Sequence, residues 1–166
     1  MKGQKEFNVL VVGELNIDLI LNKIAAFPRM GKEILAEEMT VTLGSSSAIF
    51  ANNLSILGSK VTYIGKVGND TFADQVCLTL KKSGVDIRNI IRTKEFSTGL
   101  TVALNYDNDR AMVTYPGAMH DLTIGDITDE ALNTASHMHL SSIFLQKGLK
   151  PDVIRVFKRA KELGLT

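Results

Sequence analysis

Short apolar runs typical of strands alternate along the chain with amphipathic segments typical of helices. A nearly continuous apolar run over residues 7–12 ends at Gly13, as in a strand buried on both faces of a parallel sheet. β-branched residues favour a second strand over residues 60–66, and a short third strand is expected over residues 137–140. Apolar residues recur at helical spacing in three other segments: 45–57, 70–83 and 151–163. The alternation predicts an α/β fold with a parallel sheet and right-handed crossovers.

The spacing also predicts which side of each helix is buried, because residues about four apart share one face. The second and the last helix each contain three apolar residues at such spacing. We expect these residues to face the sheet: Phe72, Val76 and Leu80 in one helix, and Val153, Phe157 and Ala160 in the other. Gly58 and Gly84 follow the first two helices and are expected to end them.

Three extended segments do not fit inside the parallel sheet. Residues 14–19 alternate between polar and apolar, residues 32–43 form a second extended stretch, and residues 100–115 resemble a hairpin with its turn at 105–110. We place these segments in a small separate β-sheet beside the main layer. Four apolar residues of the hairpin need cover there: Val102, Leu104, Met112 and Val113.

The composition limits which kinds of partner and which cellular compartment we expect. The chain has 166 residues, which fits one domain, and its net charge of +1 comes without a basic or acidic cluster. A small-molecule partner is therefore favoured over nucleic acid. Cys77 is the single cysteine, so no disulfide framework exists, and the apolar run near the polar N-terminus is too short to span a membrane. We expect a cytoplasmic protein.

The first candidate functional residues are Asn16 and Asp18. They lie just past the carboxyl end of the first buried strand, which is where open α/β sheets bind their ligands. Being two residues apart on a strand, their side chains point the same way. An amide and a carboxylate placed so can hydrogen-bond the adjacent hydroxyls of a polyol. The alternative interpretation is a solvated polar strand face.

The second candidate is the segment of Gly44, Ser45, Ser46 and Ser47, which opens the first helix. Free backbone N–H groups at a helix N-terminus suit an oxygen-rich ligand, although a plain N-cap explains the serines equally well. The segment is no phosphate-binding P-loop, because no Gly-Lys-Ser/Thr closes it, and residues 12–16 lack the dinucleotide-binding glycine pattern.

Three further features are better explained by structure than by chemistry. The glycines of residues 65–72 permit a tight strand-to-helix turn, with Asn69 or Asp70 as the helix cap. His137 and His139 share one face of a strand, but no further ligand stands near them in sequence, so packing is favoured over a metal site. Cys77 lies among apolar positions and is expected to be a buried thiol.

In order and spacing, these segments resemble the ribokinase family, also called the PfkB carbohydrate kinases. The resemblance covers the whole chain, and residues 65–72 are its most specific part. Its other elements are the Asn-x-Asp of Asn16 and Asp18, the Pro-x-x-Gly-x-Glu of residues 28–33, the stretch 44–58, Thr98-Gly99, the Tyr-Pro-Gly-Ala at 115–118, His139-Leu140-Ser141 and residues 160–166.

The resemblance implies a ribokinase-like parallel sheet flanked by helices, with a small β-sheet lid built from residues of about 14–43 and 98–116. Asn16 and Asp18 would hold sugar hydroxyls, while Gly44, Ser45 and Ser46 would lie along a sugar or nucleoside substrate. The lid would exclude water from the transferring phosphate and join two subunits into a homodimer. No nucleic-acid or membrane partner is implied.

The family's catalytic Gly-Ala-Gly-Asp segment, most ATP contacts and the monovalent-cation loop lie downstream of Thr166. By this resemblance, residues 1–166 are the N-terminal part of an ATP-dependent carbohydrate kinase domain, without the C-terminal part of the fold. Mg-ATP, and in some members a monovalent cation, would serve the full-length enzyme. The fragment is expected to contain no catalytic residue, to bind neither cofactor, and to be inactive. Leu165 and Thr166 resemble the start of a further strand.

Two departures from the family pattern leave the substrate open. Ile49 stands where a substrate-contacting asparagine is expected, and Ser141 stands where some members carry an acidic substrate contact. The competing hypothesis is a non-catalytic sugar- or nucleoside-binding module of the same fold.

Overall fold

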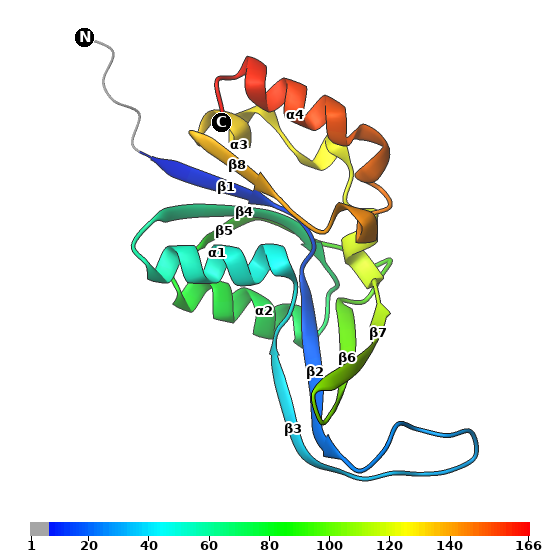
Figure 1. Ribbon diagram of the computed structural model, residues 1–166. Coiled ribbons are helices and arrows are strands. Elements are labelled where there is room, and N and C mark those ends of the chain that lie inside the picture. The colour runs from blue at the N-terminus through cyan, green and yellow to red at the C-terminus, as the bar shows by residue number, and fades with distance from the viewer. Residues whose placement is uncertain (1–6) are drawn as a thin grey trace.

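The computed structural model describes residues 7–166. Its main layer, sheet A, is a four-stranded parallel sheet with the strand order β5-β4-β1-β8 (Figure 1). Its strands are β1 (Asn8–Val12), β4 (Lys60–Val67), β5 (Asp86–Arg92) and β8 (His137–Leu140). The predicted α/β class and three of these strands are confirmed. We missed β5, because its polar residues interrupt the apolar pattern, as an edge strand permits.

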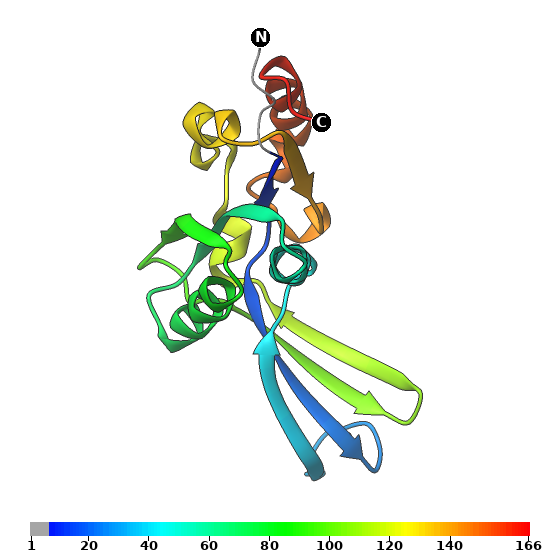
Figure 2. The same cartoon turned by 90° about the vertical axis from the view of Figure 1, so that its left-hand side faces the viewer.

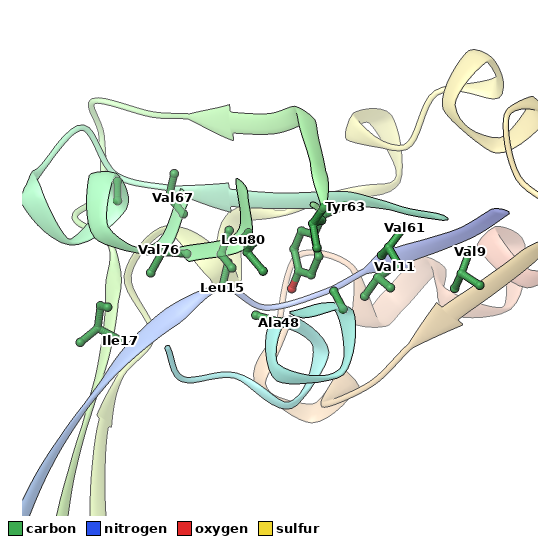
Figure 3. Packing of buried hydrophobic residues seen from close by; sticks show 13 residues of the cluster. Val9, Val11, Leu15, Ile17, Ala48, Val61, Tyr63, Val67, Val76 and Leu80 are labelled. Atoms are coloured by element: carbon green, nitrogen blue, oxygen red, sulfur yellow. The ribbon is translucent and has the colours of Figure 1, made fainter. Parts of the chain in front are cut away.

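Helices cover both faces of sheet A. On one face lie α1 (Ser46–Ile56) and α2 (Thr71–Lys82), and on the other lie α3 (Asp129–Asn133) and α4 (Val153–Glu162). Val9 and Val11 of β1 pack on the first side, whereas Leu10 and Val12 pack on the second. Figure 3 shows the first cluster, in which Tyr63 lies between sheet A and α1. The continuous apolar run of β1 therefore fills two cores at once.

The predicted helices are present, but the predicted inner faces are partly wrong. Phe72 and Phe157 are 38% and 46% exposed. The residues beside them in sequence, Ala73 and Val156, are buried instead, together with Val76, Leu80 and Ala160. A shift of one position turns a helical side chain by about 100°, which carries a bulky phenylalanine to the rim of the interface. None of the described helices has the length and apolarity to cross a bilayer.

A second sheet, sheet B, projects from this layered body as an arm (Figure 2). Its strand order is β3-β2-β6-β7, with an antiparallel hairpin-type pair at each side and a parallel contact between β2 and β6 at the centre. The strands are β2 (Asn16–Ile24), β3 (Ala36–Leu43), β6 (Gly99–Tyr106) and β7 (Asp109–Tyr115). The extended segments that did not fit the parallel sheet form this second sheet.

The two faces of sheet B differ in polarity. Residues paired across the strands share a face, and one face is apolar throughout: Ile17, Leu19, Leu21, Met39, Val41, Leu43, Leu100, Val102, Leu104, Ala111, Val113 and Tyr115. The other face carries Asp18, Thr42, Thr101 and Thr114 in one row. Met112 pairs with Ala103 on this polar side, so grouping it with Val113 was wrong: neighbours on a strand face opposite ways.

Four short 3₁₀ helices complete the described part of the chain: Gly117–Asp121, Ile124–Asp126, Ile143–Leu145 and Lys150–Asp152. The last contains Pro151 and runs directly into α4, as Pro151 predicted. Thr166 lies beside β8, where its N–H donates to Ser136 O at 3.0 Å and its carbonyl accepts from Met138 N at 3.0 Å. These bonds match the expected start of a further strand at Leu165 and Thr166.

Candidate functional site

The passage from β1 to β2 meets the start of α1 and forms the candidate site. Asn16 is the first residue of β2 and pairs with Gly99 of β6. Asp18 lies between Thr42 of β3 and Thr101 of β6. The N–H of Gly44 donates to the Asn16 carbonyl at 3.0 Å, which ties the end of β3 to the start of β2. The topology therefore brings Asn16, Asp18 and Gly44 together.

Gly44 leaves a space that two side-chain oxygens approach. A Cβ added to Gly44 would lie 2.3 Å from Oδ1 of Asp18 and 2.9 Å from Oδ1 of Asn16. Such separations are too short for any side chain, so glycine is required here by the approach of the two polar groups. Both oxygens point to one place.

Asn16 is almost completely buried, at 4% exposure. The nitrogen of its side-chain amide has hydrogen-bond partners, whereas the oxygen has none among the described residues. Its Nδ2 donates to Thr101 Oγ1 at 3.0 Å and to Asp18 Oδ1 at 3.3 Å. Its Oδ1 has no hydrogen-bond partner within residues 7–166. A buried acceptor without a partner costs about 1–3 kcal/mol, so this atom favours a ligand that donates.

Asp18 lies half-buried beside it. Burial raises the pKa of its carboxyl above the ordinary value, although hydrogen bonds from Asn16 and Thr101 and the positive charge of Arg110 act in the opposite direction. Thr101 Oγ1 also lies 3.1 Å from Thr114 Oγ1. Asp18 is thus held by polar side chains that come from neighbouring strands of sheet B.

The two candidate serines have different surroundings. Ser45 has a positive φ of 71°; its hydroxyl accepts from Ala48 N at 3.2 Å and donates to the carbonyl of Glu14. That hydroxyl serves as the N-cap of α1. Ser46 instead donates to Glu14 Oε1 at 2.9 Å and contacts Ser142. The structure therefore joins Ser46 to a hydroxyl cluster that begins two residues after Gly44.

Sequence reasoning missed the buried polar residues behind this cluster. Glu14 is 2% exposed, and Gln146 is fully buried. Gln146 Nε2 donates to Ser141 O at 2.7 Å and to Glu14 Oε2 at 3.4 Å. The alternation of residues 14–19 placed Glu14 on the polar side with Asn16, but it carried no sign of burial. Nothing local points to Gln146, which lies 132 residues away from its partner.

The glycine-containing turn of residues 65–72 has the structural role that we expected. Asp70 caps α2 by accepting from Ala73 N at 2.9 Å, and it also accepts from Thr98 N and Thr98 Oγ1, each at 2.7 Å. Burial pulls the pKa of Asp70 upward, but the hydrogen bonds from Thr98 and the α2 amides outweigh it and hold the pKa below its ordinary value. Lys66 Nζ lies 3.0 Å from Asp121 and 3.1 Å from Asp126.

The two histidines take part in packing. His139 stacks on Phe50 with ring centroids 3.9 Å apart, and burial lowers its pKa, an effect to which His137 adds. His137 Nδ1 lies 2.8 Å from Thr166 Oγ1. Among the described residues, no three His, Cys, Asp or Glu side chains gather in an arrangement that could hold a metal ion. Cys77 is half-buried, so the fully buried thiol that we expected was wrong.

A cavity of about 700 Å³ lies away from the candidate site, at the tip of sheet B. It is lined by residues such as Asn22, Asn105 and Arg110, and by acidic side chains of the β6–β7 turn. Its Lys23 is paired with Glu38 at 2.5 Å. None of the residues proposed from the sequence lines this cavity.

The chain matches known proteins over its whole described length. The family model described as pfkB family carbohydrate kinase matches residues 6–166. The 5-dehydro-2-deoxygluconokinase of Geobacillus kaustophilus is 30% identical over 157 residues, which cover 91% of this chain and 45% of that protein. The ribokinase of Staphylococcus aureus is 26% identical over 163 residues, which cover 95% of this chain and 52% of that protein.

Solved structures agree in fold. The fructokinase of Halothermothrix orenii is 28% identical and superposes with a TM-score of 0.79, covering 96% of this chain and 55% of that one. An uncharacterized sugar kinase from Pyrococcus horikoshii in complex with ATP is 26% identical, with a TM-score of 0.78 and coverage of 92% and 49%. This chain therefore spans about half the length of the relatives that it matches.

Proposed function

The chain belongs to the pfkB family of carbohydrate kinases, and on that premise we propose that it is the substrate-holding, N-terminal part of an ATP-dependent kinase. The whole enzyme transfers the γ-phosphate of ATP to a hydroxyl of a sugar or nucleoside. The observation that carries the proposal is the buried, unpaired Oδ1 of Asn16, which lies with the Asp18 carboxylate against Gly44.

These two groups suit a pair of neighbouring hydroxyls. An amide oxygen accepts one hydrogen bond from a substrate hydroxyl, and the charged carboxylate accepts a stronger one from the next. A hydrogen bond to a charged group contributes about 1.5–3 kcal/mol. Gly44 supports this role because any larger residue would collide with Asp18 Oδ1 and Asn16 Oδ1 and displace them. Ser46, the first residue of α1, would add a further hydroxyl on the same side of the substrate.

Mg-ATP is proposed as the cosubstrate, with a monovalent cation as a further candidate. The solved sugar kinase from Pyrococcus horikoshii is in complex with ATP. Among the described residues, no three His, Cys, Asp or Glu side chains form a metal cluster, and the sequence has no Gly-Lys-Ser/Thr loop, so we name no residue of this chain for Mg-ATP. We therefore propose that nucleotide binding and the catalytic base belong to the part of the relatives that this chain does not span.

Sheet B is proposed as the lid over the substrate. Its polar row of Asp18, Thr101 and Thr114 would face the sugar, and closure would exclude water from phosphoryl transfer. The opposite, apolar face leaves Met39 and Val113 exposed at 67% and 70%. We propose that a second copy of the chain covers this face, giving a homodimer joined through the lid.

The test is an ADP-release assay of the full-length gene product with Mg-ATP and a panel of pentoses, hexoses and nucleosides. ADP formation that depends on one of these substrates, and that disappears in Asp18→Ala, supports the kinase. Calorimetric binding of a sugar without ADP formation would favour the non-catalytic binding module. If the gene product neither binds nor phosphorylates any member of the panel, both proposals are contradicted.

A further inference from the structure

A buried carboxylate occupies the N-terminal end of α1. Glu14 accepts from four donors: Ser46 Oγ at 2.9 Å, Ser47 Oγ at 3.1 Å, Ser47 N at 3.4 Å and Gln146 Nε2 at 3.4 Å. The first turn of a helix attracts negative charge through its unpaired N–H groups. In this protein Glu14 supplies negative charge to this helix end from inside the chain, and the Ser45 hydroxyl caps the N–H of Ala48.

Four hydroxyls continue outward from this carboxylate. We call Ser46, Ser47, Ser141 and Ser142 the serine cluster. Ser141 Oγ lies 2.7 Å from Ser47 Oγ and 3.0 Å from Ser46 Oγ, and Ser142 Oγ lies 2.7 Å from Ser46 Oγ. Ser142 has a positive φ of 50°, a strained conformation that costs a non-glycine residue about 1–3 kcal/mol. Its neighbours hold it there in spite of that cost.

The protons available on each group determine which hydroxyl of the serine cluster donates each hydrogen bond. A serine hydroxyl has one proton to donate and two lone pairs that accept, whereas a carboxylate accepts only. The protons of Ser46 and Ser47 go to Glu14, so these two oxygens act as acceptors toward the other serines. Ser141 and Ser142 must then donate inward, to Ser46 or Ser47. Their own lone pairs are left open on the outer, partly exposed side of the cluster.

The neighbouring groups have the same polarity. Asn16 offers an unpaired Oδ1, and Asp18 offers a carboxylate, two and four residues after Glu14. We propose that this side of the substrate site consists of acceptors only, so that the substrate places hydroxyl groups of an uncharged polyol against Ser141 and Ser142. A phosphate or carboxylate is rejected at that position. The inference rests on the proposed function and deepens it by naming the substrate class.

Glu14 is in this scheme a positioning residue, since it acts on the substrate through the serine protons. A purely structural role for Glu14 would anchor α1 to Gln146 but would not decide between donors and acceptors at the outer serines. The two roles predict different affinities for fluorinated sugars, because a C–F group cannot donate a hydrogen bond.

The experiment measures KM and kcat of the full-length enzyme for its preferred sugar and for analogues with one hydroxyl replaced by hydrogen or by fluorine. At the hydroxyl that contacts Ser142, both replacements should raise KM about tenfold, with kcat unchanged. In Ser142→Ala, the unmodified sugar should show the same rise and lose its dependence on that hydroxyl. Fluorinated analogues that all bind as well as the parent sugar overturn the inference.

Two further variants sharpen the result. In Glu14→Gln, the new amide donates a hydrogen bond to one serine, and the proton of that serine hydroxyl then turns outward. The fluorinated analogue should therefore regain affinity relative to the deoxy analogue. Ser55→Ala is the control. It removes a hydroxyl that donates to Ser83 O at 2.8 Å and is not part of the serine cluster, so it should leave every ratio of KM between analogues unchanged.

Each failure has a distinct signature. Should Glu14→Gln not fold, as thermal unfolding would reveal, the inference is judged on Ser142→Ala alone. Sugar-dependent ADP formation without the fluorine pattern overturns this inference and leaves the kinase standing. No ADP formation with any unmodified sugar overturns the proposed function and this inference together.

Discussion

Asn16 and Asp18 point the same way from β2, yet burial gives them different roles. Asn16 is almost fully enclosed, and its Nδ2 is committed to Thr101 and Asp18, so only its Oδ1 remains for a ligand. Asp18 is more accessible and carries charge. At this scale, the candidate chemistry rests on which single atoms are left without partners.

Asp18→Asn keeps the shape of the side chain and removes its charge. Because a hydrogen bond to a charged group contributes about 1.5–3 kcal/mol, KM of the full-length enzyme for its sugar should rise roughly ten- to a hundredfold. Steady-state kinetics measure this. Asp107→Asn, in the exposed β6–β7 turn, is the matched control and should change nothing. Unaltered kinetics in Asp18→Asn would identify Asp18 as an ordinary solvated strand residue.

Asp70 predicts a pH dependence of stability. Its pKa is lower in the folded chain than the ordinary 3.8, so the unfolded chain binds more protons in this range. The stabilisation by Asp70 is therefore complete above about pH 4 and is lost as the pH falls through the lowered folded value. Urea unfolding between about pH 2.5 and 6 should show a smaller acid loss in Asp70→Asn than in the parent. Parallel curves for the two proteins contradict the prediction.

At the scale of elements, the close approach of β2 to the end of β3 depends on a glycine. In Gly44→Ala, the new Cβ would meet Asp18 Oδ1 and Asn16 Oδ1, so strand or side chains must move. We expect a loss of about 1–3 kcal/mol in the free energy of unfolding and weaker sugar binding. Gly125→Ala is the matched control, because its Cβ would meet Thr123 Oγ1 at an ordinary 3.5 Å. Equal stability of the two variants would contradict the packing argument.

The two faces of sheet B give a test of the proposed dimer. Val113 lies on the apolar face and Met112 on the polar face of the same strand, β7. Val113→Lys places a charge in the proposed interface and should shift the protein toward the monomer, whereas Met112→Lys should not. Light scattering at tens of micromolar reports the masses. A parent protein that is already monomeric, or equal masses for both variants, would count against a lid-mediated dimer.

At the scale of the whole molecule, the residues assigned here all lie on the sugar side of the proposed reaction. We predict that the 166-residue chain alone has no kinase activity, because it spans only about half the length of its relatives and its assigned residues serve the sugar. Loss of a catalytic base alone removes about 10²–10⁴ in rate. The measurement is ADP release by the purified chain with Mg-ATP and the sugar panel. Sugar-dependent release that disappears in Asp18→Ala would show the prediction to be wrong.

Local patterns were sufficient for most of the fold. The apolar run of β1 and the helical spacing of α1 and α2 depend on neighbouring residues, so the sequence by itself determined them. It also limited the helix caps to the serines after Gly44 and to Asn69 or Asp70, from which the structure uses Ser45 and Asp70. The same holds for the pairing of Asn16 with Asp18 on one strand face. Gly44 was predicted next to this site by family resemblance, although its steric reason was not visible.

Tertiary structure alone decided the rest. Strand β5 exists because β4 offers it an edge, and Phe72 is exposed because the partners of α2 accept Ala73 instead. Burial of Glu14 depends on Gln146, far along the chain. The sequence alone cannot tell a solvated carboxylate from one enclosed by distant donors, because local periodicity specifies which way a side chain points and long-range packing specifies what it meets.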